Sequence, residues 1–219
     1  RGIVGQDLTA ESVASIGKAI GTYIKRGGGK TMIIGRDVRT SSIEFRDILS
    51  NALNSTGCDV IDIGMVPTPV TYFALHHFKA DGGVMITGSH NPPEYNGFKI
   101  SQGVHSLYGE KVQELKRLID ANDFEIGTGN TNQREVLGHY MEKICSILKI
   151  SRKVKVVVDG GNGCFGIVGP DLLRKLGQNP VELFSEPDGT FPNHHPDPTV
   201  TEHLTHLIAK VRSENAELG

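Results

Sequence analysis

A loop rich in polar side chains follows a short apolar run near the middle of the sequence. Residues 83–86 (Gly-Val-Met-Ile) predict a buried strand, and the glycines and prolines in residues 87–97 argue against a helix or strand there. In open α/β sheets, ligands gather at the carboxyl ends of strands. We therefore expect chemistry in this loop from four side chains, namely a hydroxyl (Ser89), an imidazole (His90), an amide (Asn91) and an ammonium (Lys99).

Two kinds of chemistry fit these side chains. A hydroxyl beside an imidazole suggests acyl transfer, but adjacent residues point their side chains apart and no Gly-x-Ser-x-Gly elbow is present. The basic neighbours His90 and Lys99 suit an anion better, and they favour a phosphoryl group on Ser89. The alternative is a turn in which Ser89 and Asn91 only cap backbone groups. The residues alone leave both interpretations open.

The whole chain limits the class of protein. Its 219 residues suffice for one large domain or two ordinary ones. The 23 Lys and Arg residues and 25 Asp and Glu residues nearly balance without a basic run, so we expect no nucleic-acid partner. No apolar stretch approaches the ~20 residues of a membrane span, and we see no signal peptide, although the sequence opens inside a motif. Three scattered cysteines predict reduced thiols in a cytoplasmic protein: Cys58, Cys145 and Cys164.

Strand and helix patterns alternate along the chain, which predicts an α/β protein with mainly parallel sheets. Strands are expected at residues 31–34, 60–63, 83–86, 98–101, 154–158 and 181–184. Helices are expected at residues 9–26, 41–56, 67–78, 109–119, 136–148 and 201–212, and around residues 172–176. Residues 124–133 are poor in core residues and rich in Gly, Thr and Asn, which predicts a connector. We therefore expect one domain at residues 1–134 and a second at residues 135–219.

Other motifs compete for a function. The turn at residues 159–163 (Asp-Gly-Gly-Asn-Gly) has the outline of a nucleotide-phosphate cradle, but its spacing matches neither Gly-x-Gly-x-x-Gly nor a P-loop, so a tight turn is favoured. A non-catalytic module that binds a nucleotide or phosphosugar there stays the rival hypothesis. His76 and His77 are interpreted as helix-end residues, and His194 and His195 as part of a proline-rich connector rather than metal ligands.

The serine loop has a specific counterpart. Residues 87–99 (Thr-Gly-Ser-His-Asn-Pro-Pro-Glu-Tyr-Asn-Gly-Phe-Lys) closely resemble the active-site loop of the α-D-phosphohexomutase family, most of all its bacterial phosphomannomutase/phosphoglucomutase group. Other segments agree in the same order, namely residues 1–2, 35–39, 64–69, 158–163 and 191–198. The resemblance covers essentially the whole chain. It implies two α/β/α sandwich domains with mixed, mainly parallel sheets, the second domain being truncated before its metal-binding loop.

The resemblance implies a reaction and residue roles. The family interconverts hexose 6-phosphate and hexose 1-phosphate, here of mannose, glucose or both, through a bisphosphorylated sugar. Ser89 would carry the phosphoryl group, Lys99 and Arg1 would manage the proton and the charge, and His90 would orient the phosphate. Supporting roles fall to Asn91, Arg36, Asp37 and Arg39, although two arginines in such a turn could also bind an anion or merely pair with Asp37.

Cofactors and partners follow from the same resemblance. One Mg²⁺ would bridge the Ser89 phosphate and three aspartates that lie beyond Gly219, and hexose 1,6-bisphosphate would be the activator. The partner would be a phosphosugar, with no nucleic acid and no membrane, and the intact enzyme would be a monomer. The metal and the groups that bind the substrate phosphate each contribute several kcal/mol of transition-state stabilisation. The resemblance places these groups beyond Gly219, so this chain alone is expected to be inactive. Its incomplete second sheet is expected to allow self-association.

Overall fold

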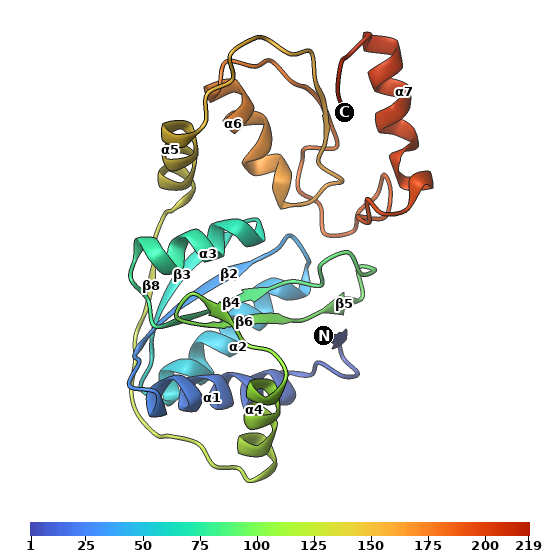
Figure 1. The fold of residues 1–219 in the computed structure, drawn as a ribbon. Coiled ribbons are helices and arrows are strands. Elements are labelled where there is room, and N and C mark those ends of the chain that lie inside the picture. Colours follow the sequence, from blue (N-terminus) through green and yellow to red (C-terminus); the bar gives the residue numbers. More distant parts are fainter. The chain divides into compact units, whose positions relative to one another are not determined.

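The computed structural model describes residues 1–219 and contains two compact units (Figure 1). The first unit comprises Arg1–Ser89 and Glu94–Val136, and the second comprises His90–Pro93 and Leu137–Gly219. Both units alternate strands and helices along the chain. The α/β class expected from the sequence pattern is therefore confirmed.

A mixed six-stranded sheet forms the centre of the first unit, in the order β7-β6-β4-β2-β3-β8. Its parallel strands are β2 (Thr31–Arg36), β3 (Asp59–Met65), β4 (Gly82–Ile86) and β8 (Thr131–Gln133). The antiparallel edge consists of β6 (Phe98–Gln102) and β7 (His105–Ser106). Every residue of β4 is buried, as expected for a strand covered on both faces. The carboxyl ends of β4, β2, β3 and β8 consequently lie along one edge.

Helices cover both faces of this sheet (Figure 1). One face holds α1 (Ala10–Arg26), α2 (Ser41–Ser55) and α4 (Glu110–Asp120), and the other holds α3 (Thr68–His77). Alternate strand residues point to the two faces. The main core lies beneath α1 and α2, where Ile20, Leu49 and Ile34 are fully buried. This packed layer holds the strand ends rigidly in register.

The helix starts agree with the sequence in one case and differ in another. Thr9 and Ser12 form a capping box at the expected helix start, in which each side chain accepts a hydrogen bond from the other residue's backbone N–H, at 2.9 and 3.2 Å. Ser41 and Ser42 have hydroxyls typical of a helix cap, but they form none, because α2 has no side-chain cap bond. Both hydroxyls instead accept hydrogen bonds from the side-chain amide of Asn96, at 2.8 and 3.0 Å. Their role is therefore tertiary.

Besides β7, which the sequence predicts as a turn and which pairs with the adjacent β6, three further short strands were missed by the sequence analysis. β1 (Gly2–Ile3) pairs antiparallel with β5 (Tyr95–Asn96), which lies inside the loop expected to contain no strand. β8 (Thr131–Gln133) lies inside the expected connector and extends the sheet beside β3. All three residues of β8 are exposed and polar, so no apolar alternation marks it. Each of these strands forms because a partner distant in sequence supplies its hydrogen bonds.

The second unit contains shorter elements. In chain order they are α5 (Leu137–Ile147), β9 (Val157–Asp159), the 3-10 helix η1 (Cys164–Ile167), α6 (Gly169–Lys175), β10 (Val181–Leu183), the 3-10 helix η2 (Thr201–Leu204) and α7 (Thr205–Glu214). β9 pairs parallel with β10, and Val156 forms an isolated bridge with Leu218. The backbone N–H of Val157 donates to the Leu218 carbonyl at 3.0 Å, so the other edge of β9 is partly paired. The expected self-association through this sheet stays a prediction.

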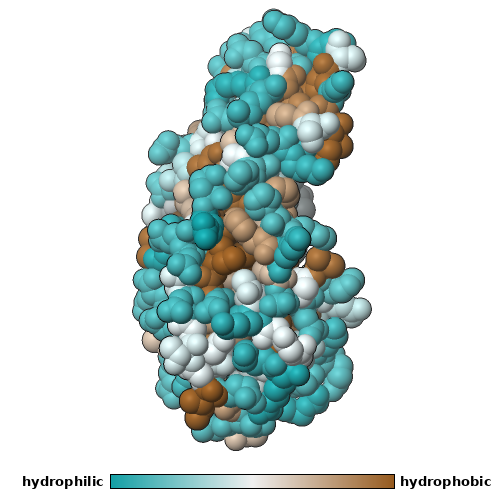
Figure 2. All heavy atoms as spheres, turned by 90° about the vertical axis from the view of Figure 1, so that its left-hand side faces the viewer, coloured by the Kyte–Doolittle hydropathy of each residue, from teal (hydrophilic) through white to brown (hydrophobic).

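Apolar side chains of the second unit are incompletely buried. Neither α5 nor α7 contains a buried residue. Figure 2 shows apolar spheres gathered on the upper part of the view, and the exposed apolar residues of this unit include Ile147, Leu148, Phe165 and Leu218.

No helix of the chain combines the length and apolar character required to cross a membrane.

Candidate active site

Ser89 follows β4 at the carboxyl edge of the sheet and is partly buried. The loop closes on itself, because the Thr87 backbone N–H donates to the Gly97 carbonyl at 2.9 Å. Ser89 has a φ of 56°, a left-handed conformation that costs a non-glycine residue about 1–3 kcal/mol. Its N–H donates to the Thr87 Oγ1 at 2.9 Å. The backbone of the candidate nucleophile is therefore strained, and the surrounding structure must hold it in place.

The buried guanidinium of Arg39 holds both arms of this loop. Only 1% of Arg39 is exposed. Its Nη2 donates to the Ser89 carbonyl and its Nη1 to the Tyr95 carbonyl, both at 3.0 Å. Its Nε donates to the Asp37 Oδ2 at 3.1 Å. Burial lowers the pKa of Arg39, and the nearby Asp37 opposes that shift. One planar fork thus links the outgoing and returning strands of the loop.

The carboxylate of Asp37 is the second fixed point. It accepts hydrogen bonds from the backbone N–H of Arg39 at 3.0 Å, from the Ser42 hydroxyl at 2.7 Å and from the Gly88 N–H at 3.2 Å. A Cβ on Gly88 would lie 2.5 Å from the Arg39 Cζ, so only glycine fits between the guanidinium and the loop. Asp37 and Arg39 therefore contact the serine loop directly, as the resemblance implied for supporting residues.

Asn96 is a buried positioning residue that the sequence analysis did not single out. Its Nδ2 donates to the Ser41 and Ser42 hydroxyls, and its Oδ1 accepts from the Gly97 N–H at 2.8 Å. The available signal was the Asn-Gly dipeptide at residues 96–97, which typically indicates a turn. Here the asparagine side chain instead links the returning arm of the loop to the start of α2. Thr87, which bonds the Ser89 N–H, was missed in the same way.

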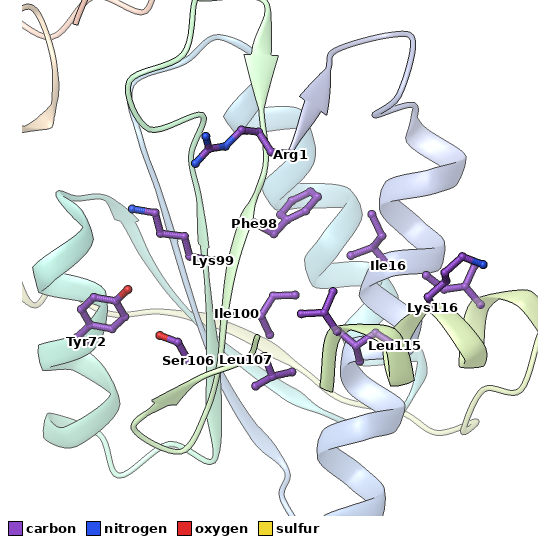
Figure 3. A pocket seen from close by; sticks show the side chains of 12 residues that line it. Arg1, Ile16, Tyr72, Phe98, Lys99, Ile100, Ser106, Leu107, Leu115 and Lys116 are labelled. Atoms are coloured by element: carbon purple, nitrogen blue, oxygen red, sulfur yellow. The ribbon is translucent and has the colours of Figure 1, made fainter. Parts of the chain in front are cut away.

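Arg1 and Lys99 line one pocket of about 470 Å³ on the antiparallel edge of the sheet (Figure 3). Both residues are exposed. In Figure 3 the side chains of Arg1 and Lys99 extend to one side of β6, and the apolar Phe98 and Ile100 point to the other. Pairing of β1 with β5 places the start of the chain beside β6. The approach is close, since a Cβ on Gly97 would lie 2.9 Å from the Arg1 Cα. The structure thus brings the two predicted cationic residues together, although Ser89 is not among the residues that line this pocket.

The remaining predicted residues are placed less specifically. His90 is exposed, and His90–Pro93, which includes Asn91, groups with the second unit. Arg36 ends β2 and donates from Nη1 to the Asp37 carbonyl at 3.3 Å, so it reaches the serine loop only through Asp37. Its side chain lines a different pocket. The assigned roles of His90, Asn91 and Arg36 stay predictions.

The residues of this chain do not by themselves fit the expected magnesium site. No group of three or more His, Cys, Asp or Glu side chains in the chain is placed to hold a metal ion. Asp37, the carboxylate nearest in the network around Ser89, already accepts from Arg39, Ser42 and Gly88. Ser89 therefore remains the one residue that we assign to a metal, through its phosphate.

The turn at residues 159–163 is occupied by bonds within the second unit. A phosphate cradle needs backbone N–H groups that point to the ligand. Here all four N–H groups from Gly160 to Gly163 donate internally, to the Leu183 carbonyl, the Asp159 carboxylate, the Phe184 carbonyl and the Gly160 carbonyl, each at 2.8 Å. The His194 Nε2 also lies 3.1 Å from both Asp159 carboxylate oxygens. The arrangement is that of a tight structural turn, so it does not favour the rival hypothesis.

Comparison with known proteins matches both units of the chain to one family. The family model "Phosphoglucomutase/phosphomannomutase, alpha/beta/alpha domain I" matches residues 1–125, and the corresponding domain II model matches residues 138–219. A phosphomannomutase/phosphoglucomutase of Pseudomonas aeruginosa is 46% identical over 219 residues, which is all of this chain and 47% of that protein. A phosphoglucomutase of Neisseria meningitidis is 40% identical over 221 residues, which is 48% of that protein.

A solved structure agrees with the fold as well as the sequence. The crystal structure of a phosphoglucomutase/phosphomannomutase family protein from Burkholderia thailandensis superposes with a TM-score of 0.95 at 42% identity. The match covers 99% of this chain and 49% of that protein. The chain thus spans about half the length of the curated relatives that it matches.

Proposed function

Because this chain belongs to the phosphoglucomutase/phosphomannomutase family, we propose that it forms the phosphoryl-carrying part of an enzyme that interconverts hexose 6-phosphate and hexose 1-phosphate. The substrate would be mannose phosphate, glucose phosphate or both, and we propose that the enzyme accepts both sugars. The observation that carries the proposal is the strained and clamped Ser89, which the Arg39 guanidinium holds by its carbonyl at 3.0 Å. Strained backbone of this kind concentrates at functional sites.

In the proposed reaction Ser89 rests as phosphoserine. Its O–P bond breaks as a new O–P bond forms to the free hydroxyl of the bound hexose phosphate, and the hydroxyl proton leaves to a base. The resulting hexose 1,6-bisphosphate turns end over end and returns its other phosphoryl group to Ser89. Such transfers depend mainly on positioning and charge neutralisation. The Asp37–Arg39 network would supply the positioning, since it fixes the backbone that carries the serine oxygen.

Three further residues would act on the transferred group. Lys99 and Arg1 would share the proton and the charge beside the accepting hydroxyl, which is supported by their exposure and their common pocket. His90 would orient the serine phosphate, as the resemblance implies, with Asn91 holding the loop. A pocket lined by cationic side chains suits a substrate that carries a phosphate at each end in turn.

The remaining parts of the proposal come from the family. Mg²⁺ would be the metal cofactor and hexose 1,6-bisphosphate the activator, with Ser89 the only residue of this chain assigned to the metal. We propose a cytoplasmic monomer, and the three free cysteines, two of them buried, are consistent with a reducing compartment. Steady-state turnover by this chain alone is expected to be negligible, because the metal and clamp groups implied by the resemblance are not among its residues.

Intact-mass measurement tests the proposal. The chain is incubated with hexose 1,6-bisphosphate and Mg²⁺, and peptide mapping then locates any phosphoryl group. We expect one phosphoryl group on Ser89 and none on a Ser89→Ala variant. Ser146→Ala is the matched control, because Ser146 is an exposed serine outside the pocket of Lys99 and its loss should leave the labelling unchanged. Equal labelling of the chain and its Ser89→Ala variant would refute the assignment.

A further inference from the structure

A second polar pocket, of about 320 Å³, lies at the carboxyl edge of the first unit's sheet. It is formed where β2, β3 and β8 end and where α2 packs beside them. Three arginines line it together with two acidic residues and an amide: Arg36, Arg46, Arg134, Asp62, Glu135 and Gln133. None of these residues lines the pocket that holds Arg1 and Lys99, so the two pockets are separate.

The charges of this pocket are unequally paired. Asp62 is 2% exposed, and its Oδ2 lies 2.6 Å from the Arg46 Nη1 while its Oδ1 accepts the Gly64 N–H at 2.9 Å. The carboxylate of Asp62 is thereby committed to Arg46 and to the turn after it. In contrast, no carboxylate oxygen lies within 4.0 Å of a nitrogen of the Arg36 or Arg134 side chain. Two guanidiniums in the pocket thus carry charge without an ion-pair partner.

One of these groups is also incompletely hydrogen-bonded. The Arg36 Nε is buried and has no hydrogen-bond partner. The Nη1 of the same side chain donates only to the Asp37 carbonyl, at 3.3 Å. Buried donors in native proteins nearly always have an acceptor, since leaving one unpaired is costly. The Nε itself is closed to solvent, so an acceptor inside the pocket would bond the terminal nitrogens of Arg36, whose side chain lines it.

We propose that this pocket binds a phosphate group. Arginine forks bind carboxylate and phosphate with paired charge-assisted hydrogen bonds. Arg36, Arg46 and Arg134 come from a strand end, a helix and the segment after another strand, so they approach from different directions. A tetrahedral phosphate has enough oxygens to accept from three such groups, whereas a planar carboxylate has two. The bound group is inorganic phosphate or the phosphate of a sugar phosphate. This site is additional to the one at which the proposed reaction of Ser89 takes place.

The test uses the ¹⁵N-labelled chain and the arginine Nε–Hε resonances, with inorganic phosphate as the probe and chloride at equal ionic strength as the reference. The Arg36 signal is identified by its loss in Arg36→Gln. We expect phosphate to shift this signal saturably, and we expect Arg134→Gln to weaken the binding about tenfold, as loss of one charge-assisted hydrogen bond predicts. Arg134 is exposed, so its removal should leave the fold intact. Arg117→Gln is the control, because Arg117 is an exposed arginine outside the pocket.

Two outcomes would overturn the proposal. One is an Arg36 signal that moves with neither inorganic phosphate nor hexose 6-phosphate at millimolar concentration. The other is a phosphate affinity that Arg134→Gln leaves at the level of the Arg117→Gln control. A second titration, with hexose 6-phosphate on a Ser89→Ala chain, separates the sources. Tighter binding of the sugar phosphate would identify the ester as the ligand, and equal binding would identify the bare phosphate group.

Discussion

Replacement of Arg39 by lysine tests how the nucleophile loop is held. Lysine keeps a positive charge next to Asp37, but it has one nitrogen where the guanidinium uses three, on the Asp37 carboxylate and on the Ser89 and Tyr95 carbonyls. We expect the ammonium to stay with the carboxylate, because charge-assisted bonds are the stronger ones. Both carbonyls would then lose their donor.

The magnitude follows from these two lost bonds. A buried acceptor left unpaired costs about 1–3 kcal/mol. Ser89 and Tyr95 are only partly buried, so water can replace part of each bond, and we take the lower end of that range for both. The free energy of local opening of the loop should therefore fall by about 2–3 kcal/mol, which is roughly a 30- to 150-fold loss of hydrogen-exchange protection. Without the clamp, the strained Ser89 can also relax from its φ of 56°.

Amide hydrogen exchange measures this effect directly. The informative amides are those of Thr87 and Ser89, whose acceptors are the Gly97 carbonyl and the Thr87 hydroxyl. Arg26→Lys is a matched control, because Arg26 forms its ion pairs with Asp123 and Glu125 on the surface, where such pairs contribute little. If both loop amides are as well protected in Arg39→Lys as in Arg26→Lys, the claim that the Arg39 side chain holds this loop is refuted.

Other predictions concern neighbouring parts of the network and the fold. Gly88→Ala should destabilise the first unit by about 1–3 kcal/mol in urea unfolding, because its Cβ would lie 2.5 Å from the buried Arg39 guanidinium; a neutral result would contradict the close approach. Thr9→Ala should cost about 1 kcal/mol through loss of the capping box, read as a lower urea midpoint with an unchanged slope. The Lys30 ammonium and then the Asn130 N–H lower the pKa of Asp59 below its ordinary value of about 4, so its stabilisation is present above that pH and is lost as the pH falls through the folded-state pKa. Asp59→Asn should accordingly flatten the stability curve in this acid range, and an unchanged curve would exclude the linkage.

The central strands could be predicted from the sequence because local pattern and burial coincide there. The apolar runs of β2 and β4 and the capping box of α1 are each readable within a few residues. β5 and β8 could not be predicted, because their strand geometry depends on backbone partners more than 60 residues away in sequence. Short polar segments carry no local signal for such pairing.

The sequence offers candidate reactive groups for the site, and these stay predictions, but it does not reveal the residues that support them. The type and neighbours of Ser89 indicated phosphoryl chemistry, and the resemblance added Arg1, which no local pattern would have selected. The sequence could not reveal that Asn96 holds Ser41 and Ser42, since hydroxyls at a helix start normally predict a cap. Nor could it separate Arg36 from Arg39, two arginines of one turn of which only the second reaches the Ser89 carbonyl.

A pulse–chase measurement tests the central claim that Ser89 carries a phosphoryl group between the two ends of one sugar. The chain, extended by the family's metal-binding and substrate-clamping segments, is labelled on Ser89 with hexose 1,6-bisphosphate, freed of excess donor, and then mixed with hexose 6-phosphate and Mg²⁺. We predict that the label leaves Ser89 and appears on the sugar as hexose 1,6-bisphosphate. A label that stays on Ser89 or is released only as inorganic phosphate would contradict the account.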